Sequence, residues 1–292
     1  MTPGIRHMIV ASFFFSVMTV FVKIVGQSVP VAQIVLIRSC LAVVFTLMMM
    51  KRDSGRITFG MRKDLLVLRG LLGFAAILCF YYALPRLPLA EATLIQYTNP
   101  VFVALFAGFA LRERVGAREL GAIGLCVIGV VLLSRPTALG SSATASLNPQ
   151  HVLIAMSGAF LSGAAYAVVR KLRETDNALT VVLYFPMLSI PLSIPLVFFD
   201  HVSPDLTEWA CLVGIGITSQ IGQVFMTMSY HAERAARASA ASYIQILFAI
   251  MWGLLLFGEK VDIWLLFGAL LVVGGTAAVS LVRPLRKTPL RD

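Results

Sequence analysis

Polar side chains recur at helical spacing inside several strongly apolar runs of this sequence. One set follows steps of four, three and four residues and comprises Ser12, Ser16, Thr19 and Lys23. A second set follows steps of three, four and three residues and comprises Gln220, Gln223, Thr227 and Tyr230. Such steps place each set on one face of a helix. The hydroxyl and amide groups on that face either bind a polar solute or hydrogen-bond to a neighbouring helix.

Two further polar sets lie in the fourth and ninth apolar runs. The first contains Thr93, Gln96, Tyr97 and Pro100, and the second contains Ser239, Ser242 and Tyr243. A buried amide costs more than a buried hydroxyl, so Gln220 and Gln223 favour a water-filled cavity. Small hydroxyl residues commonly join membrane helices. For Ser12 and Ser16 the helix contact is therefore the commoner alternative, although a place in the cavity stays open.

Tyrosines supply a third kind of group, because each combines an apolar ring with one hydroxyl. Those within the apolar runs are Tyr82, Tyr97, Tyr166, Tyr184 and Tyr243. Such side chains suit a pocket for metabolites of mixed polarity, although each could equally be a packed residue with a satisfied hydroxyl. The predicted solute-binding residues are Arg38, Tyr82, Gln96, Tyr97, Gln220, Gln223 and Tyr243. Further cavity candidates are Ser12, Ser16, Thr93, Tyr166, Thr227 and Ser242.

Arg38 lies near the middle of the second apolar run, whereas Lys23 and Arg69 are close enough to the ends of theirs to reach the membrane surface. A charge at such depth needs a partner. The sequence offers three kinds: backbone carbonyls at a helix end, water in a cavity, or the carboxylate of a substrate. The binding role and the structural role of Arg38 are evenly balanced.

Catalytic and metal-binding chemistry is not indicated. All fourteen Asp and Glu residues fall in loops or near the ends of the apolar runs, and so do the four histidines. The four cysteines lie inside apolar runs, with neither a CxxC motif nor a histidine at ligand spacing. We therefore expect no enzyme, no metal site, no cofactor and no proton relay inside the membrane.

The composition of the chain indicates which class of protein contains these polar residues. Of the 292 residues, 59% are hydrophobic and 13% are charged, whereas soluble domains average about 45–50% and about 25%. A helix needs about 20 apolar residues to cross a bilayer, so about ten spans use most of the chain. The sequence predicts an all-α polytopic membrane protein with no soluble domain. The net charge of +10 is scattered over short loops, which argues against nucleic acid as a partner.

Ten transmembrane helices are predicted, at 7–26, 30–50, 64–84, 89–110, 118–134, 151–171, 178–198, 207–230, 238–257 and 262–282. If both termini are cytoplasmic, eighteen Lys and Arg residues fall on the cytoplasmic side and three on the other. Positive charge is retained on the cytoplasmic side of membrane proteins. The bias therefore fixes the predicted orientation.

The two halves of the chain are similar to each other. A shift of 146 positions lays Tyr97–Ser134 over Tyr243–Ser280 with nine identities in 38 positions, including Tyr97 with Tyr243 and Glu113 with Glu259. Because five is an odd number, two consecutive five-helix units must enter the bilayer in opposite orientations. Inverted repeats of this kind are typical of secondary transporters, whose substrate site lies near the midplane between the halves.

The stretch YYALPRLPLAEATLIQYTNPVFVALFAGFALRERVGARELGAIGLCVIGVVLL, which begins at Tyr81, resembles the first EamA repeat of the drug/metabolite transporter superfamily. SYIQILFAIMWGLLLFGEKVDIWLLFGALLVVGG, from Ser242, repeats the pattern more loosely. The resemblance implies a ten-helix bacterial metabolite exporter, most similar to the branch that exports amino acids. It assigns residues 1–135 to a first repeat, 136–150 to a non-cytoplasmic linker, 151–282 to a second repeat and 283–292 to a basic cytoplasmic tail.

Four prolines are predicted hinges: Pro100, Pro186, Pro191 and Pro195. Each removes one bond from a helix ladder, so the helix can bend there, although a fixed kink is the commoner outcome. Ile246 is the counterpart of Pro100. A hinge that depends on this proline would therefore exist in only one half.

The predicted function is secondary transport, most simply export, of small polar or zwitterionic metabolites such as amino acids, by alternating access with weak or no proton coupling. One alternative is a transporter of anionic or nucleotide-bearing metabolites, which would need several basic residues in its cavity. The other is an intramembrane enzyme, which the peripheral acids and histidines disfavour. The expected partners are a small-molecule substrate and the lipid of a bacterial inner membrane, and the expected oligomeric state is a monomer.

The orientation is testable by cysteine labelling. In a cysteine-free background, a cysteine substituted for Ser141 should react with a membrane-impermeant maleimide added outside intact cells, because the charge bias places that loop on the non-cytoplasmic side. Cysteines at Arg56 and Arg286 should react only after the cells are opened. If the cysteine at Ser141 reacts only from the cytoplasmic side, the predicted topology is wrong.

Overall fold

The computed structural model describes residues 2–54, 60–110, 121, 124–125, 128–132, 147–172, 175–232 and 241–281. Within these ranges every regular element is a helix. Six helices are long and apolar enough to cross a bilayer: α1 (Pro3–Val25), α2 (Val31–Ser54), α3 (Lys63–Ala83), α7 (Pro149–Leu172), α8 (Ala178–Phe199) and α9 (Leu206–Ala232). An all-helical polytopic membrane protein is thus confirmed.

The shorter helices correct one predicted boundary. They are α4 (Leu89–Gln96), α5 (Asn99–Ala110), α11 (Ile244–Phe257) and α12 (Ile263–Leu281). The continuous helix expected over 89–110 is interrupted between α4 and α5. Pro100 supplies a physical reason, because it has no N–H to donate to the carbonyl four residues earlier, that of Gln96.

Parts of the predicted architecture lie outside the described residues. The helix expected at 118–134 is represented by helical pieces at 121, 124–125 and 128–132, and the helix expected at 238–257 is described from residue 241. The tail at 283–292 and most of the linker at 136–150 fall beyond the described ranges. The count of ten membrane crossings therefore stays a prediction.

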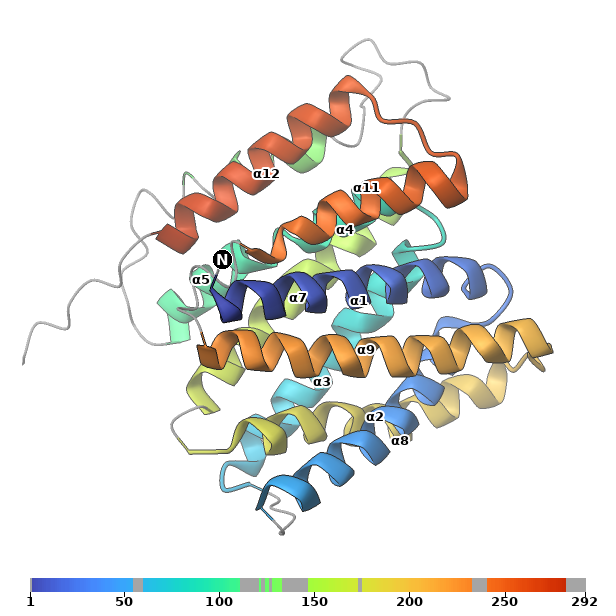
Figure 1. Cartoon of the computed structure of the whole chain (residues 1–292), viewed down its shortest axis with the longest axis vertical. Helices are drawn as coiled ribbons and strands as arrows, with labels where there is room; N and C mark the ends of the chain where they lie inside the picture. The colour runs from blue at the N-terminus through green and yellow to red at the C-terminus, as the bar shows by residue number, and fades with distance from the viewer. Residues whose placement is uncertain are drawn as a thin grey trace, which may run out of the picture.

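Helices of the two halves alternate in space (Figure 1). α1 packs along α9, α3 packs along α7, and α2 packs along α8, so that each pair takes one helix from each half. Exchanging the halves turns the α1–α9 pair into the α7–α3 pair and leaves the α2–α8 pair unchanged. This is the contact pattern expected of two repeats related by a two-fold axis.

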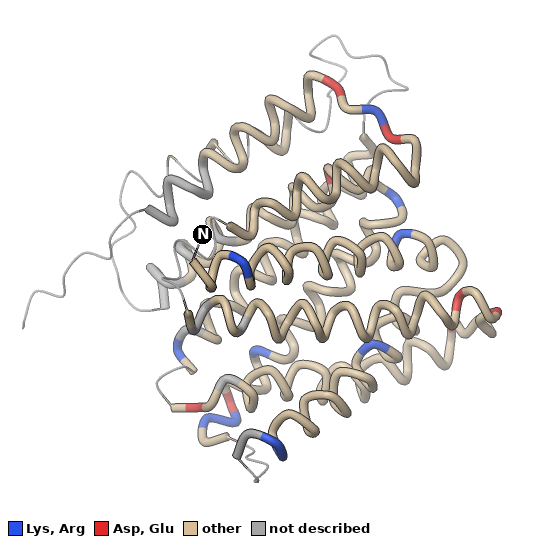
Figure 2. The backbone as a smooth tube through the Cα atoms, in the orientation of Figure 1, with Lys and Arg blue, Asp and Glu red and all other residues tan. Residues whose placement is uncertain are grey.

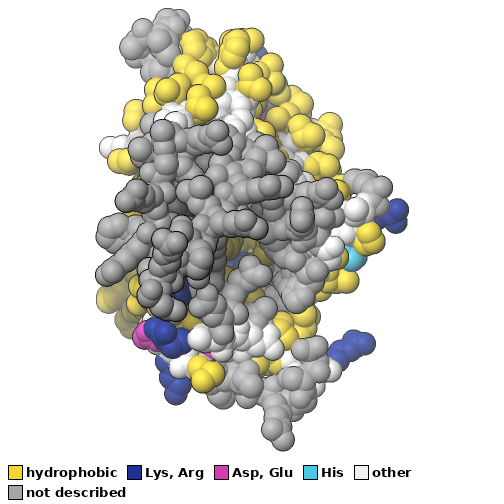
Figure 3. All heavy atoms as spheres, turned by 90° about the vertical axis from the view of Figure 1, so that its left-hand side faces the viewer, with side chains coloured by type: hydrophobic (Ala, Val, Ile, Leu, Met, Phe, Trp, Pro, Cys, Tyr) yellow, Lys and Arg dark blue, Asp and Glu magenta, His cyan; other side chains and the backbone are white. Residues whose placement is uncertain are grey.

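Charged residues are concentrated at the two ends of the helix bundle (Figure 2). Lys, Arg, Asp and Glu mark loops and helix ends, and only a few basic positions interrupt the helix middles. Seen from the end that carries the N-terminus, described basic side chains lie at the right and lower margins, and hydrophobic side chains gather mainly toward the top (Figure 3). An apolar belt between two charged ends is the distribution that a bilayer requires.

Glycines allow α1 and α9 to pack closely. An added β-carbon at Gly214 would lie 2.9 Å from the ring of Phe21, and one at Gly222 would lie 2.8 Å from the ring of Phe15. Both phenylalanines are on α1, so their rings fill hollows that only glycine leaves on α9. α8 continues without interruption through Pro186, Pro191 and Pro195, whose role as hinges remains a prediction.

Candidate functional site

Two helix interruptions, one from each half, meet inside the bundle. Tyr97 directly follows α4 and Tyr243 directly precedes α11, so the equivalent tyrosines of the two repeats both lie at an interruption. Their ring centroids are 5.4 Å apart, with the rings inclined at 50°. Interrupted membrane helices expose backbone groups at the interruption, and transporters use such positions to bind substrates and ions.

The hydroxyl of Tyr97 joins the two interruptions. It lies 3.0 Å from the carbonyl oxygen of Ser242 and 2.9 Å from Oε1 of Gln245, and its one proton is donated to either acceptor. The amide of Ile246 donates to the carbonyl of Tyr243, three residues back, in the bond that opens α11. The Ser242 carbonyl also accepts a long bond, 3.5 Å, from the hydroxyl of Ser12 on α1. The first repeat therefore supplies side-chain donors to the interruption in the second.

Unused hydrogen-bonding capacity lies next to this contact, on α4. Gln96 donates from Nε2 to the hydroxyl of Ser162 at 3.0 Å, but its buried Oε1 has no partner among the described residues. The hydroxyl of Thr93, which is 1% exposed, likewise has none within the described ranges. Buried polar groups are nearly always paired in folded proteins, so these two atoms are suited to a polar ligand.

The other hydroxyls on α1 are already used within the protein. Ser16 donates to the carbonyl of Phe13 at 2.7 Å and accepts from Nε1 of Trp252 on α11 at 3.0 Å. Thr19 donates to the carbonyl of Ser16 at 2.7 Å. This part of the polar face thus connects α1 with α11, as a helix contact would.

The predicted residues on α9 and the remaining tyrosines lie elsewhere. Gln220 is buried and turned toward α2, where Nε2 is 3.9 Å from Sδ of Met49. Gln223 is half-buried on α9, and the side chain of Thr227 lies outside the described part. Tyr82, near the end of α3, contacts the ring of His151 edge to face, and Tyr166 is 44% exposed on α7. The structure therefore brings together Gln96, Tyr97, Tyr243 and Ser242 more closely than the rest.

Arg38 lies between aromatic rings rather than beside a carboxylate. Its guanidinium carbon is 5.9 Å from the ring centre of Tyr81 and 5.6 Å from that of Phe185. Arg69 approaches the same Phe185 ring at 5.0 Å. Arg69 was expected at the membrane surface, so this cluster was not predicted from the sequence. Phe185, within an apolar run, gave no signal of it.

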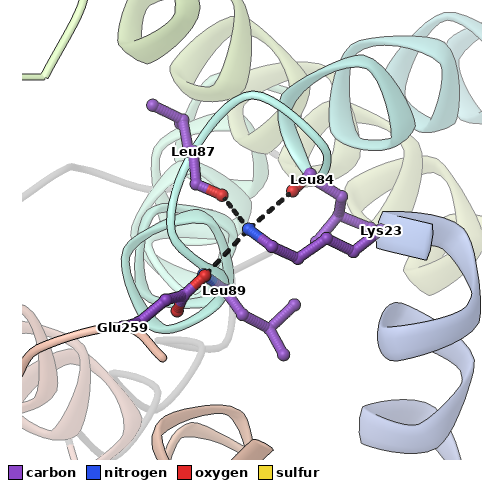
Figure 4. Close-up of polar contacts among 5 residues, drawn as sticks. All are labelled: Lys23, Leu84, Leu87, Leu89 and Glu259. Atoms are coloured by element: carbon purple, nitrogen blue, oxygen red, sulfur yellow. Dashed lines mark hydrogen bonds and ion pairs between the residues drawn. The ribbon is translucent and has the colours of Figure 1, made fainter. Parts of the chain in front are cut away.

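An ion pair joins the end of α1 to the loop after α11, next to the start of α4 (Figure 4). Nζ of Lys23 is 2.9 Å from Oε1 of Glu259 and donates to the carbonyls of Leu87 at 2.6 Å and Leu84 at 3.4 Å. The Glu259 carboxylate also accepts from the amide of Leu89, at 3.0 and 2.8 Å to its two oxygens, and so caps α4. The side chains are only 9% and 17% exposed. This contact, the Lys23–Glu259 knot, ties α1, the start of α4 and the loop after α11 together.

A hollow elsewhere on the molecule has the wrong chemistry for a polar solute. Its volume is about 410 Å³, and it is lined by Leu36, Ile194, Val197, Phe198 and His201. Phe198 is 83% exposed. Four apolar side chains on α2 and α8 and one histidine in the loop after α8 suit contact with lipid better than they suit a polar substrate.

Known proteins share this architecture. The profile of the EamA-like transporter family matches residues 2–135 and 150–281. The chain belongs to the EamA-like transporter family. Like its relatives in the drug/metabolite transporter superfamily, this EamA protein is a transporter and not an enzyme.

Individual relatives extend over nearly the whole chain. This EamA protein is 31% identical over 278 residues to the pseudopaline exporter CntI of Pseudomonas aeruginosa, with 95% of each chain covered. It is 25% identical over 294 residues to solute carrier family 35 member G1 of Homo sapiens, covering 95% of this chain and 79% of the relative. A crystal structure with 20% sequence identity superposes with a TM-score of 0.63 over 94% of this chain, which shows that the fold is shared.

The Lys23–Glu259 knot should contribute measurably to stability. Glu259→Gln keeps the shape of the side chain but leaves the Lys23 ammonium without its counter-charge, so the free energy of unfolding should fall by about 2 kcal/mol. Lys23→Met in the same protein should recover part of that loss. A double-mutant cycle measured by unfolding in mixed micelles should give a coupling energy of about 1–3 kcal/mol.

The exposed ion pair between Arg62 and Asp64 is the matched control. Its side chains are 45% and 63% exposed, so Asp64→Asn should leave the stability unchanged within error. Additive effects of Lys23→Met and Glu259→Gln would show that the knot contributes nothing as a pair.

Proposed function

We propose that this EamA protein exports small polar or zwitterionic metabolites, of the amino-acid kind, by alternating access between its two repeats. The observation that carries the proposal is the meeting of two interrupted helices at Tyr97 and Tyr243. Hydroxyl, amide and backbone groups from both repeats converge there inside an apolar bundle. A solute that binds at this contact touches both repeats and is released when they move apart.

The Lys23–Glu259 knot supports alternating access. It joins α1 and the start of α4, in the first repeat, to the loop after α11, in the second. All its contacts lie at one end of the helices, where in the proposed topology they face the non-cytoplasmic side. Separating the repeats at that end requires the loss of the Lys23–Glu259 ion pair and of the bond from the Leu89 amide to Glu259, because the bonds from Lys23 to Leu84 and Leu87 lie within the first repeat.

Export is the direction favoured by a relative, since CntI is named an exporter and is similar over 95% of this chain. Cytoplasmic termini, a bacterial inner membrane and a monomeric state belong to the same proposal. The proposed binding residues remain Arg38, Tyr82, Gln96, Tyr97, Gln220, Gln223 and Tyr243. The second candidate function, transport of anionic metabolites, is favoured by one specific observation, namely that Arg38 and Arg69 both approach the ring of Phe185.

Substitutions at Gln223 and Tyr97 test whether these side chains bind the solute or only stabilise the fold. Gln223→Ala should reduce the uptake of labelled amino acids into proteoliposomes at least fivefold while the amount of folded protein changes little, because its amide is proposed to line the path. Tyr97→Ala should reduce uptake to a similar extent, because it removes the hydroxyl shared by the two repeats. Counterflow with a panel of labelled amino acids measures both effects and identifies the accepted solutes.

Gln33 is the matched control. Its amide donates to the carbonyl of Val202 at 2.8 Å and accepts from the amide of the same residue at 3.2 Å, so it links α2 to the loop after α8. Gln33→Ala should lower the melting temperature without changing the apparent affinity of the remaining protein. If Gln223→Ala behaves in the same way, its role is structural.

Transport should not depend on protons. Every described Asp and Glu lies in a loop or in a terminal turn of a helix, and buried Glu91 lies in the first turn of α4. A proton relay across the membrane needs titratable groups at depth. A pH gradient imposed on proteoliposomes should therefore drive no uphill accumulation. Accumulation that an uncoupler abolishes would contradict this expectation.

A further inference from the structure

We propose that Arg38 and Arg69 form an anion-binding site that selects solutes carrying at least two carboxylates, such as dicarboxylic acids and acidic amino acids. This proposal rests on the proposed transport function and restricts its substrates, within the amino-acid kind and the anionic metabolites, to acidic solutes. The two residues come from different helices, α2 and α3, and meet at Phe185 on α8. One aromatic ring therefore has two guanidinium groups beside it, at 5.6 and 5.0 Å.

Neither arginine has a counter-charge among the described residues. The ion pairs within the described ranges, Lys23–Glu259 and Arg62–Asp64, do not include them. Arg38 is 7% exposed, and its Nε and Nη1 have no hydrogen-bond partner in that part of the chain. Nε of Arg69 is also buried and likewise has no hydrogen-bond partner among the described residues. Two cations that approach one aromatic ring without a counter-charge in the described ranges are costly in a membrane, so their presence points to a ligand that neutralises them.

A glycine makes room for the site. An added β-carbon at Gly73 would lie 2.7 Å from Nη1 of Arg69 and 2.9 Å from Cδ2 of Phe185. Real β-carbons do not approach other atoms so closely, so any larger residue would displace either the guanidinium or the ring. The absence of a side chain at Gly73, one turn after Arg69, therefore leaves room for the Arg69 guanidinium to lie along α3 next to Phe185.

The chemistry of the cluster defines the ligand. Each guanidinium presents parallel N–H groups that fit one carboxylate, so two guanidinium groups fit two carboxylates. A neutral zwitterion would satisfy one arginine and leave the other uncompensated. Succinate and glutamate would satisfy both.

Binding can be measured on the purified full-length protein in detergent, through the rise in melting temperature with added solute. Succinate and glutamate should stabilise the protein, whereas alanine and inorganic phosphate should have little effect. Arg38→Gln and Arg69→Gln should each weaken the apparent affinity for succinate roughly tenfold or more. Arg52→Gln, at an exposed position on the same helix as Arg38, is the matched control and should bind like the unsubstituted protein.

The ligand-free melting temperature distinguishes binding from bracing. Removal of one of two uncompensated charges should leave it unchanged or raise it by about 2–4 °C, whereas removal of a structural brace would lower it. Arg38→Lys keeps the charge but loses the paired N–H geometry, and should weaken glutamate binding without lowering stability. Gly73→Ala should weaken succinate binding with all charges intact.

Several results would overturn the site. They are the absence of any shift with succinate and glutamate, an equal shift with alanine or phosphate, or unchanged succinate affinity in Arg69→Gln. Transport is judged separately. Uptake of neutral amino acids that depends on Gln223 and Tyr97 but not on the arginines would leave the proposed function standing and remove the anion site.

Discussion

The requirement that every backbone and polar group be satisfied away from water governs this structure. Where α4 ends at Tyr97 and α11 begins at Tyr243, the helix ladder is interrupted in a region that lipid cannot hydrate. The hydroxyl of Tyr97 reaches the carbonyl of Ser242, so each interruption is completed by the opposite repeat. Contact between the halves is therefore a condition for the polar site to exist at all.

Basic groups within the bundle show two different solutions to the cost of burial. Lys23 is fully compensated, by a carboxylate and two carbonyls at a helix end. Among the described residues, aromatic rings lie next to the guanidinium groups of Arg38 and Arg69. Cation–π contacts with phenylalanine replace part of the lost hydration but provide no counter-charge. The first arrangement stabilises the contact between α1 and the loop after α11. The second leaves two positive charges that a bound anion would neutralise.

Sequence patterns predicted the features that depend on local composition. The apolar runs gave the long helices, and the internal repeat singled out Tyr97 and Tyr243. The partner of Lys23 could not be predicted, because Glu259 is 236 residues away along the chain and only tertiary packing brings the two together. Arg69 was assigned to the membrane surface by its closeness to a helix end, since nothing local showed that Gly73 lets it fold inward. Ile246, in place of a proline, likewise gave no warning that the second half is interrupted at Tyr243.

α4 connects the closure at one end to the polar site. It has eight residues, so it extends about 12 Å at 1.5 Å per residue. Glu259 caps its first residue, Leu89, and Tyr97 follows its last, Gln96. A short helix held at both ends moves as one rigid piece, because bending it would break several of its few internal bonds. In the proposed alternating-access cycle, release of Glu259 would free α4 at its Leu89 end and would shift Tyr97 relative to Ser242 at its other end. In that cycle the same eight residues would connect the contact with Glu259 at one end of α4 to the hydrogen bond between the two repeats at the other.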